Sequence, residues 1–155
     1  MRDEAEAEAG PGAGMPMRIG QAVMLHRGGD RAMARERLGG LWAELGADGD
    51  AVQQCLLAYY LAGVQDDAHD ALAWDLRALQ AARGAADESA VRGFYPALYL
   101  RLAADYARLG RIAEARRELA EARVAAGRAG DGDFAAGVRA GIGRLAARLE
   151  GMAPS

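Results

Sequence analysis

The sequence contains no lysine, only one cysteine and no long apolar run. All 19 of its basic residues are arginine, and 22 acidic residues outnumber them, so the formal net charge at pH 7 is −3. A chain with this charge has no general attraction for phosphate backbones, and nucleic acid is not expected as a partner. The single cysteine, Cys55, cannot form an internal disulfide, which fits a reducing compartment.

Membrane and export signals are also missing from the sequence. No apolar stretch approaches the roughly 20 residues of a membrane-spanning helix, and the N-terminal region lacks the apolar core of a signal peptide. We therefore expect a cytoplasmic protein without a membrane partner. The Glu/Ala alternation and the Gly and Pro residues near the N-terminus predict a disordered tail over residues 1–16. A single domain over residues 17–150 and a short tail over residues 151–155 are predicted to follow.

Residue types that build catalytic or metal sites are scarce. One of the two histidines, His69, lies in the segment QDDAHD (65–70) with three carboxylates, which is one pattern of a metal site. Aspartate is also favoured at turns and in the first turn of a helix, and we prefer that explanation. Cys55 lies beside Leu56 on an apolar face and is expected in the core. Without a glycine-rich phosphate loop or a nucleophile elbow, the sequence predicts no enzyme activity, no cofactor and no metal.

The sequence is rich in residues that favour helices. Ala, Leu, Arg and Glu dominate, and apolar residues recur three and four positions apart between clusters of Gly and Asp. Strand patterns with two-residue alternation are nearly absent. These features predict an all-α protein. The expected helices cover residues 17–27, 31–45, 50–63, 68–83, 88–109, 112–126 and 132–149.

Aspartates lie where most of these helices begin. Their carboxylates accept hydrogen bonds from backbone N–H groups that have no partner inside the helix. Pro96 falls inside the expected helix over 88–109, where it predicts a kink or a nearby helix start. The expected N-caps are Asp30, Asp50, Asp67, Asp87 and Asp131.

Small residues recur along the chain and mark a repeat of two helices. Ala71 follows Ala34 by 37 residues, and Ala115 follows Ala71 by 44 residues. A period of this length with two helices per unit is typical of stacked helical arrays. The unequal spacing indicates a degenerate repeat whose third pair carries an insertion.

The third helix pair carries the strongest motif, in the segment LAADYARLGRIAEARRELAEA (102–122). Small alanines allow two antiparallel helices to approach closely, and Tyr106 fills the space beside them. A Leu-Gly turn at Gly110 joins the helices, because glycine accepts the left-handed conformation. This pattern resembles a tetratricopeptide (TPR) repeat, in a small stand-alone form whose lysine-free composition is typical of bacteria. The motif positions are Tyr99, Leu102, Ala103, Tyr106, Ala115, Leu119 and Ala122.

The resemblance extends over roughly residues 17–149 and implies a fold. That fold is an all-α, right-handed superhelix of about three antiparallel helix pairs with a C-terminal capping helix. An all-helical bundle without superhelical stacking is the alternative. Asp75 departs from the TPR pattern, because a large apolar residue is usual at its position. We prefer a half-exposed helix edge for Asp75; the alternative is a buried ion pair with an arginine of a neighbouring helix, because an unpaired buried carboxylate is costly.

The resemblance also implies a binding groove. In the family, the first helix of each pair lines a concave face that binds an extended peptide or a helix of a partner. One branch clamps a C-terminal carboxylate with Lys and Asn, but Leu100 and Ala104 occupy those positions here, so that mode is not expected. The resemblance therefore implies a non-catalytic protein- or peptide-binding adaptor. The groove residues that it implies are Gln53, Leu56, Tyr60, Ala97, Leu100, Ala104 and Arg108.

Two other functions stay open at this point. A groove closed by the last helix would suit a protein that binds or sequesters a small molecule. A homodimer that buries its own groove is the other alternative, because terminal surfaces are a large share of a short array.

Overall fold

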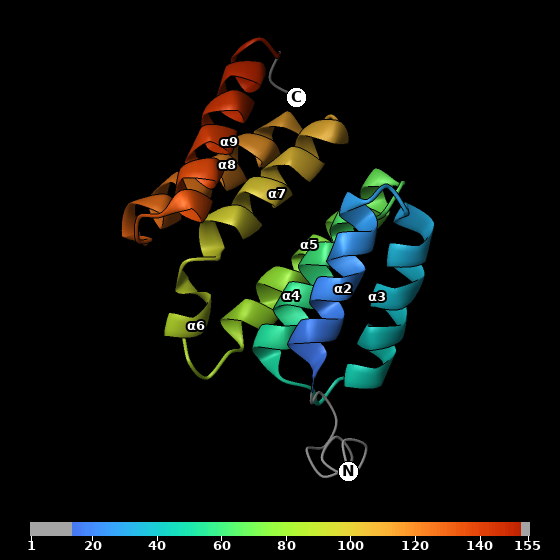
Figure 1. The fold of residues 1–155 in the computed structure, drawn as a ribbon. Coiled ribbons are helices and arrows are strands. Elements are labelled where there is room, and N and C mark those ends of the chain that lie inside the picture. The colour runs from blue at the N-terminus through green and yellow to red at the C-terminus, as the bar shows by residue number, and fades with distance from the viewer. Residues whose placement is uncertain (1–13, 153–155) are drawn as a thin grey trace, which may run out of the picture.

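The computed structural model describes residues 14–152, and this part of the chain consists of helices and loops without a strand (Figure 1). The all-α prediction is confirmed. None of the described helices is both long enough and apolar enough to cross a bilayer. The helices are α2 (Met15–Arg27), α3 (Arg31–Leu45), α4 (Ala51–Gly63), α5 (Ala68–Arg83), α6 (Ser89–Arg92), α7 (Tyr95–Arg108), α8 (Ile112–Arg128) and α9 (Asp133–Glu150).

The start of α2 differs slightly from its predicted position. The helix begins at Met15, whose side chain is completely buried, so Met15 and Pro16 belong to α2 although the tail was predicted over residues 1–16. Residues 1–13 of that predicted tail, and residues 153–155 at the other end, lie outside the described residues.

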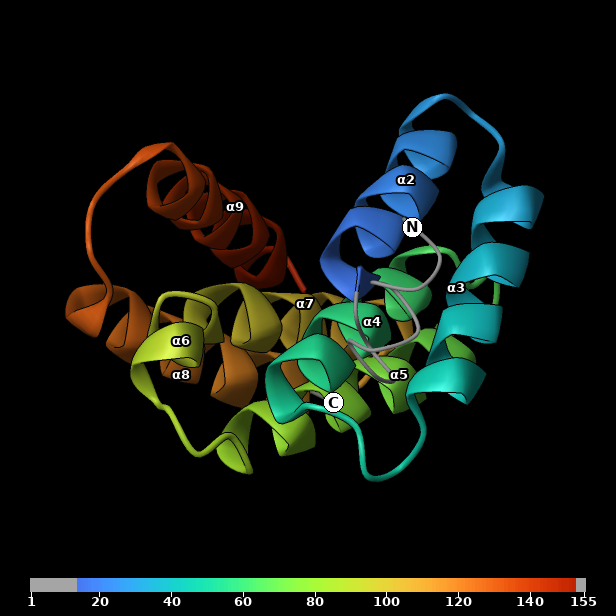
Figure 2. The ribbon, with the colours of Figure 1, turned by 60° about the horizontal axis from the view of Figure 1, so that its bottom comes forward.

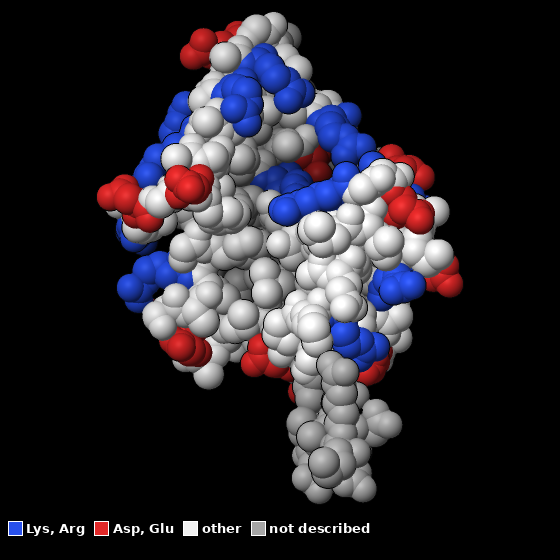
Figure 3. All heavy atoms as spheres, in the orientation of Figure 1, with Lys and Arg blue, Asp and Glu red and all other residues white. Residues whose placement is uncertain are grey.

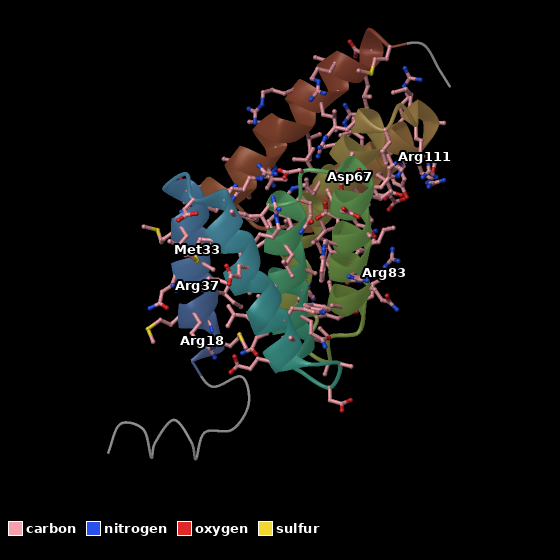
Figure 4. The ribbon with its side chains drawn as sticks, turned by 90° about the vertical axis from the view of Figure 1, so that its right-hand side faces the viewer. Arg18, Met33, Arg37, Asp67, Arg83 and Arg111 are labelled. Carbon is pink, nitrogen blue, oxygen red and sulfur yellow. The ribbon has the colours of Figure 1, made fainter. Side chains whose placement is uncertain are left out.

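Aspartate side chains cap three helices as predicted. Asp30, Asp50 and Asp67 each accept a hydrogen bond from a backbone N–H in the first turn of the helix that follows. Asp67 begins α5, which Figure 4 shows together with Arg83 at its other end. The carboxylate of Asp87 accepts from the backbone N–H of Ser89 at 3.0 Å, just at the start of α6. The QDDAHD segment is therefore a turn and a helix start, as we preferred.

The expected helix over 88–109 is interrupted. The chain leaves α6 at Gly93 and enters α7 after Phe94, with Pro96 in the first turn of α7. A proline there loses no helical hydrogen bond, because the first N–H groups of a helix have no partner within it. Of the two expected outcomes, Pro96 produces the helix start.

Arginines fasten α9 to the rest of the fold. The prediction that Asp131 caps α9 is wrong, because the residue before the helix is Gly132. Oδ1 of Asp131 instead lies 3.5 Å from Nη1 of Arg139. Arg139 also donates to the carbonyl of Ala126 near the end of α8, at 3.0 Å. Arg116 on α8 donates to two carbonyls at the C-terminal end of α9, at 2.9 and 3.0 Å. Hydrogen bonds thus link α8 and α9 near both ends of α9.

Consecutive helices pack as pairs, α2 with α3, α4 with α5 and α7 with α8. The pairs contact one another through α3 with α4 and α5 with α7, while α9 packs on both α7 and α8. Figure 2 shows the result as an arch, with α2, α4, α7 and α9 on its inner side and α3, α5 and α8 on its outer side. The helices therefore form two layers, and the inner layer is concave.

Small residues lie where paired helices meet. Ala103 of α7 and Ala115 of α8 are fully buried in one hydrophobic cluster, and the ring of Tyr106 packs in the same cluster. The first pair buries Ala22 and Ala34 in the same way. Because alanine has no side-chain atom beyond Cβ, the helix axes approach closely and the larger side chains fill the space beside the contact.

Two tryptophans connect the two hydrophobic clusters of the protein. Trp42 of α3 and Trp74 of α5 each pack against both clusters, and their rings meet edge to face with centroids 5.1 Å apart. An aromatic pair of this geometry contributes about 0.5–1.5 kcal/mol beyond the area that it buries. The pair stiffens the contact between the first two helix pairs.

We expect Ala115→Leu to lower the free energy of unfolding by about 1–3 kcal/mol, because the added atoms overpack the contact between α7 and α8. Urea denaturation followed by circular dichroism measures this change. Ala113→Leu is the matched control, because Ala113 lies exposed on the same helix and should change stability by less than about 0.5 kcal/mol. Equal stabilities of the two variants would contradict a tight contact at Ala115.

Candidate functional site

The inner helices enclose a concave channel. α4 and α7 form its floor, and α2 and α9 rise on opposite sides as its walls (Figure 2). The space-filling view shows the hollow between the walls, with arginine side chains near its centre (Figure 3). Two cavities lie along the channel, one beside each wall.

The first cavity, which we call the α9 cavity, lies between α7 and α9 and has a volume of about 580 Å³. α9 approaches α7 closely at Gly141, because glycine has no side chain there. A Cβ atom at this position would lie only 2.8 Å from Cδ2 of Leu100. Phe134 at the start of α9 is 54% exposed and presents its ring to the cavity. The charged groups in the lining are Arg101, Arg144, Arg148 and Asp133.

The second cavity, which we call the α2 cavity, lies between α2 and α4 and also measures about 580 Å³. Its lining is mostly apolar and includes Met17 and Met24, which are 63% and 65% exposed. Leu56 and Tyr60 supply the side from α4. Methionine side chains are flexible and polarizable, and such surfaces suit apolar partners of varied shape.

A row of four aromatic rings joins the two cavities. The ring centroid of Tyr60 lies 5.6 Å from that of Tyr59, which lies 4.8 Å from that of Phe94. Phe94 in turn stacks on Phe134 of α9 at 6.0 Å, with 14° between the ring planes. Because Tyr60 lines the α2 cavity and Tyr59 lines the α9 cavity, the two cavities lie on either side of one pair of contacting rings.

The groove residues implied by the TPR resemblance divide between these cavities. Ala97, Leu100 and Ala104 line the α9 cavity, and Leu56 and Tyr60 line the α2 cavity. The structure therefore brings five of the seven residues to the channel.

The other two predicted groove residues lie outside both linings. Gln53 is in the first turn of α4, where its N–H binds the capping carboxylate of Asp50. Arg108 is exposed at the end of α7. Neither residue lines a cavity of the channel.

No residue of α9 was predicted in the site, because the last helix was expected only as a cap or as a helix that closes the groove. A signal is present in the sequence: Phe134, Gly137, Gly141, Arg144 and Arg148 recur at intervals of three and four, which places them on one helix face. That face carries glycine and arginine instead of leucine. Such a face is open to other atoms, and the structure turns it toward the channel.

Asp75 lies behind the α9 cavity and is fully buried. Only 1% of its surface is exposed, so the expected half-exposed position is wrong. The alternative, a buried link to an arginine, is closer to what the structure has, because Nη1 of Arg101 lies 3.9 Å from Oδ1 of Asp75. A second carboxyl lies beside it, that of Asp105 on α7, which is 2% exposed and was not predicted there.

The two buried carboxyl groups require a proton. As carboxylates, both oxygens of Asp75 and Oδ2 of Asp105 would accept no hydrogen bond from the described part of the chain. With a proton, Asp75 donates to Asp105. Burial and then the neighbouring Asp105 raise the pKa of Asp75 to about 10, against the opposing charge of Arg101. At neutral pH the pair therefore carries at most one negative charge.

A third cavity of about 550 Å³ lies outside the channel, between α6, α7 and α8. Arg83 reaches Tyr99 there and donates to its hydroxyl at 3.0 Å. The arginines of this cavity are accompanied by Glu88 and Glu121, and Arg83 lies in the last turn of its helix, where cations are favoured. Arg83 thus has a structural role, and the cavity lies on the outside of the arch, so we assign the site to the channel.

Within residues 14–152, no group of three or more His, Cys, Asp and Glu side chains could hold a metal ion. The channel offers aromatic and apolar contact together with guanidinium donors.

No family model, no curated protein and no solved structure matches the chain.

We expect Asp75→Asn to flatten the pH dependence of stability. The unfolded chain loses the Asp75 proton near the ordinary pKa of 3.8, whereas the folded chain keeps it to about pH 10. Between these values the folded state binds one proton more, so this group lowers the free energy of unfolding as pH rises. Asparagine has no such proton to lose, and its amide still donates to Asp105. Urea denaturation between pH 5 and pH 8 should show a smaller loss of stability for Asp75→Asn than for the parent.

The control for this experiment is Asp48→Asn, because Asp48 is exposed in the loop between α3 and α4. Its pH profile should match that of the parent. Parallel profiles for the parent and Asp75→Asn would show that Asp75 is ionised in the folded protein.

Proposed function

We propose that this chain is a non-catalytic adaptor of the cytoplasm, with TPR-like architecture, that binds a segment of a partner protein along its channel. The observation that carries this proposal is the placement of the two cavities on either side of the contacting rings of Tyr59 and Tyr60. Together the cavities offer a long apolar surface on the inner side of the arch. A surface of this length suits an extended or helical protein segment better than a compact small molecule.

The packing of the helix pairs supports the TPR-like part of the proposal. The alanines that mark the repeat, Ala34, Ala71 and Ala115, are all buried. Each lies on the second helix of a pair, and successive pairs contact one another through neighbouring helices. Side-by-side stacking of this kind produces the curvature on which concave binding surfaces depend.

The composition of the channel supports the binding of a protein partner. Tyrosine and arginine are enriched among the residues that carry most of the energy at protein interfaces, and Tyr59, Tyr60 and Arg101 lie at the centre of this surface. The guanidinium carbon of Arg101 lies 4.1 Å from the centroid of the Tyr59 ring, which holds both groups in place. A preformed aromatic surface loses little side-chain entropy on binding.

We expect Gly137→Trp to abolish partner binding. Gly137 lines the α9 cavity, and a Cβ atom there would meet no atom within 4 Å, so the helix can accept a side chain that then fills the cavity. Affinity capture from a lysate of the native cell, analysed by mass spectrometry, measures the partners recovered. Gly143→Trp is the matched control, because Gly143 is exposed on the same helix with no atom within 4 Å and lies outside the cavity lining.

The control variant should recover the same partners as the parent chain. Undiminished recovery by Gly137→Trp would remove the channel as the binding site.

A further inference from the structure

The α9 cavity carries an excess of positive charge, and two of its three arginines have no partner among the other described residues. Arg144 and Arg148 are exposed on α9 and make no hydrogen bond or ion pair with the other described residues. Asp133, at the start of α9, is the one acidic group of the described residues in the lining, against three arginines. Several other described arginines bind acidic side chains or backbone carbonyls, as Arg35 and Arg116 do.

Arg101 adds to this charge although it lies near buried carboxyl groups. Its Nη1 atom donates one long hydrogen bond, 3.3 Å, to the carbonyl oxygen of Tyr59, and lies 3.9 Å from Asp75. The Asp75 carboxyl keeps its proton at neutral pH, for the reasons given above, so the buried pair places at most one negative charge, that of Asp105, near the guanidinium. The Nε and Nη2 groups of Arg101 donate no hydrogen bond to the other described residues, and they can therefore bind an anion in the cavity.

We infer that the segment bound in the channel is acidic, and that its aspartate or glutamate side chains bind Arg101, Arg144 and Arg148 while apolar side chains beside them pack on Phe134 and Leu100. This inference rests on the proposed function and specifies the chemistry of the partner. Guanidinium groups form paired, charge-assisted hydrogen bonds with carboxylates, which gives both strength and direction. The apolar residues of the same lining supply the contact area.

The arrangement of the arginines favours carboxylates spread along a segment over one terminal carboxylate. Arg144 and Arg148 lie one turn apart on α9, about 6 Å along the axis, and Arg101 reaches the cavity from α7. Donors placed on two helices suit several carboxylates in succession. Nucleic acid is a poor alternative, because the chain has a net charge of −3 and Asp133 lies in the same lining.

The test is selection of random 12-residue peptides displayed on phage, with each peptide joined at its C-terminus to the coat protein so that no free carboxylate is present. The full chain is compared with the double variant Arg144→Gln/Arg148→Gln, which removes two charges from exposed side chains without a structural partner. Glutamine retains good helix propensity, and circular dichroism confirms the fold.

The matched control is Arg37→Gln/Arg123→Gln, which removes the same charge from exposed positions on α3 and α8 outside the channel. Arg37 is marked in Figure 4. We expect peptides selected by the parent and by the control to be enriched in Asp and Glu beside apolar residues. The Arg144→Gln/Arg148→Gln variant should lose that enrichment.

Individual selected peptides are then synthesised with blocked ends and measured by fluorescence anisotropy. Changing their acidic residues to the amides, or using Arg144→Gln/Arg148→Gln, should weaken binding about tenfold, and affinity should fall as salt increases. Gly137→Trp should prevent binding of the same peptides, which locates them in the channel.

Each contrary result has its own meaning. Channel-bound peptides without acidic enrichment, or with affinity unchanged in Arg144→Gln/Arg148→Gln, would overturn this inference and leave the proposed function standing. Acidic peptides that still bind Gly137→Trp would also overturn it, because they bind elsewhere. Failure to select any peptide would contradict both proposals. A parent chain that sediments as a dimer, and a Gly137→Trp variant that sediments as a monomer, would make a second copy the occupant and overturn the inference.

Discussion

The close approach of antiparallel helices at alanine contacts is the constraint on which the rest of the fold depends. Ala103 and Ala115 bring α7 and α8 together, and Ala22 and Ala34 do the same for α2 and α3. Each pair is then a compact unit that packs sideways on the next pair. The concave face is fixed by these buried contacts, whereas exposed side chains of the channel such as Phe134, Arg144 and Met24 lie outside the core. The channel surface is therefore available for binding without cost to the core.

Electrostatics connect this core to the channel through Arg101. Two ionised carboxylates buried side by side would repel each other and lack hydrogen-bond donors, so a shared proton is the less costly state for Asp75 and Asp105. The proton reduces the negative charge beside the Arg101 guanidinium, which lies over the ring of Tyr59 at the channel wall, from two charges to at most one. A buried feature of the fold thereby limits the negative charge near the site of a bound partner.

Local signals predicted most of the helices and their starts well, because the residues that begin a helix lie next to it in the sequence. Asp30, Asp50 and Asp67 identified the helix starts through the hydrogen bonds that each carboxylate makes nearby. Burial at Asp75 was not predictable in this way, because it depends on which helix packs against it and on the distant Asp105. The role of α9 was missed for a related reason. The spacing of its glycines and arginines places them on one helix face, but only the packing shows that this face lies opposite α7.

α9 contains three glycines, Gly137, Gly141 and Gly143, and each costs the helix about 1 kcal/mol relative to alanine. The helical conformation of α9 consequently depends on its packing against α7 and α8. Hydrogen bonds from Arg116 and Arg139 stabilise this packing. One wall of the channel is thus weakly helical on its own, while the opposite wall belongs to a tightly paired unit. By thermodynamic linkage, any molecule that spans the two walls also protects α9 from local opening, so slowed amide hydrogen exchange in this helix reports occupancy directly.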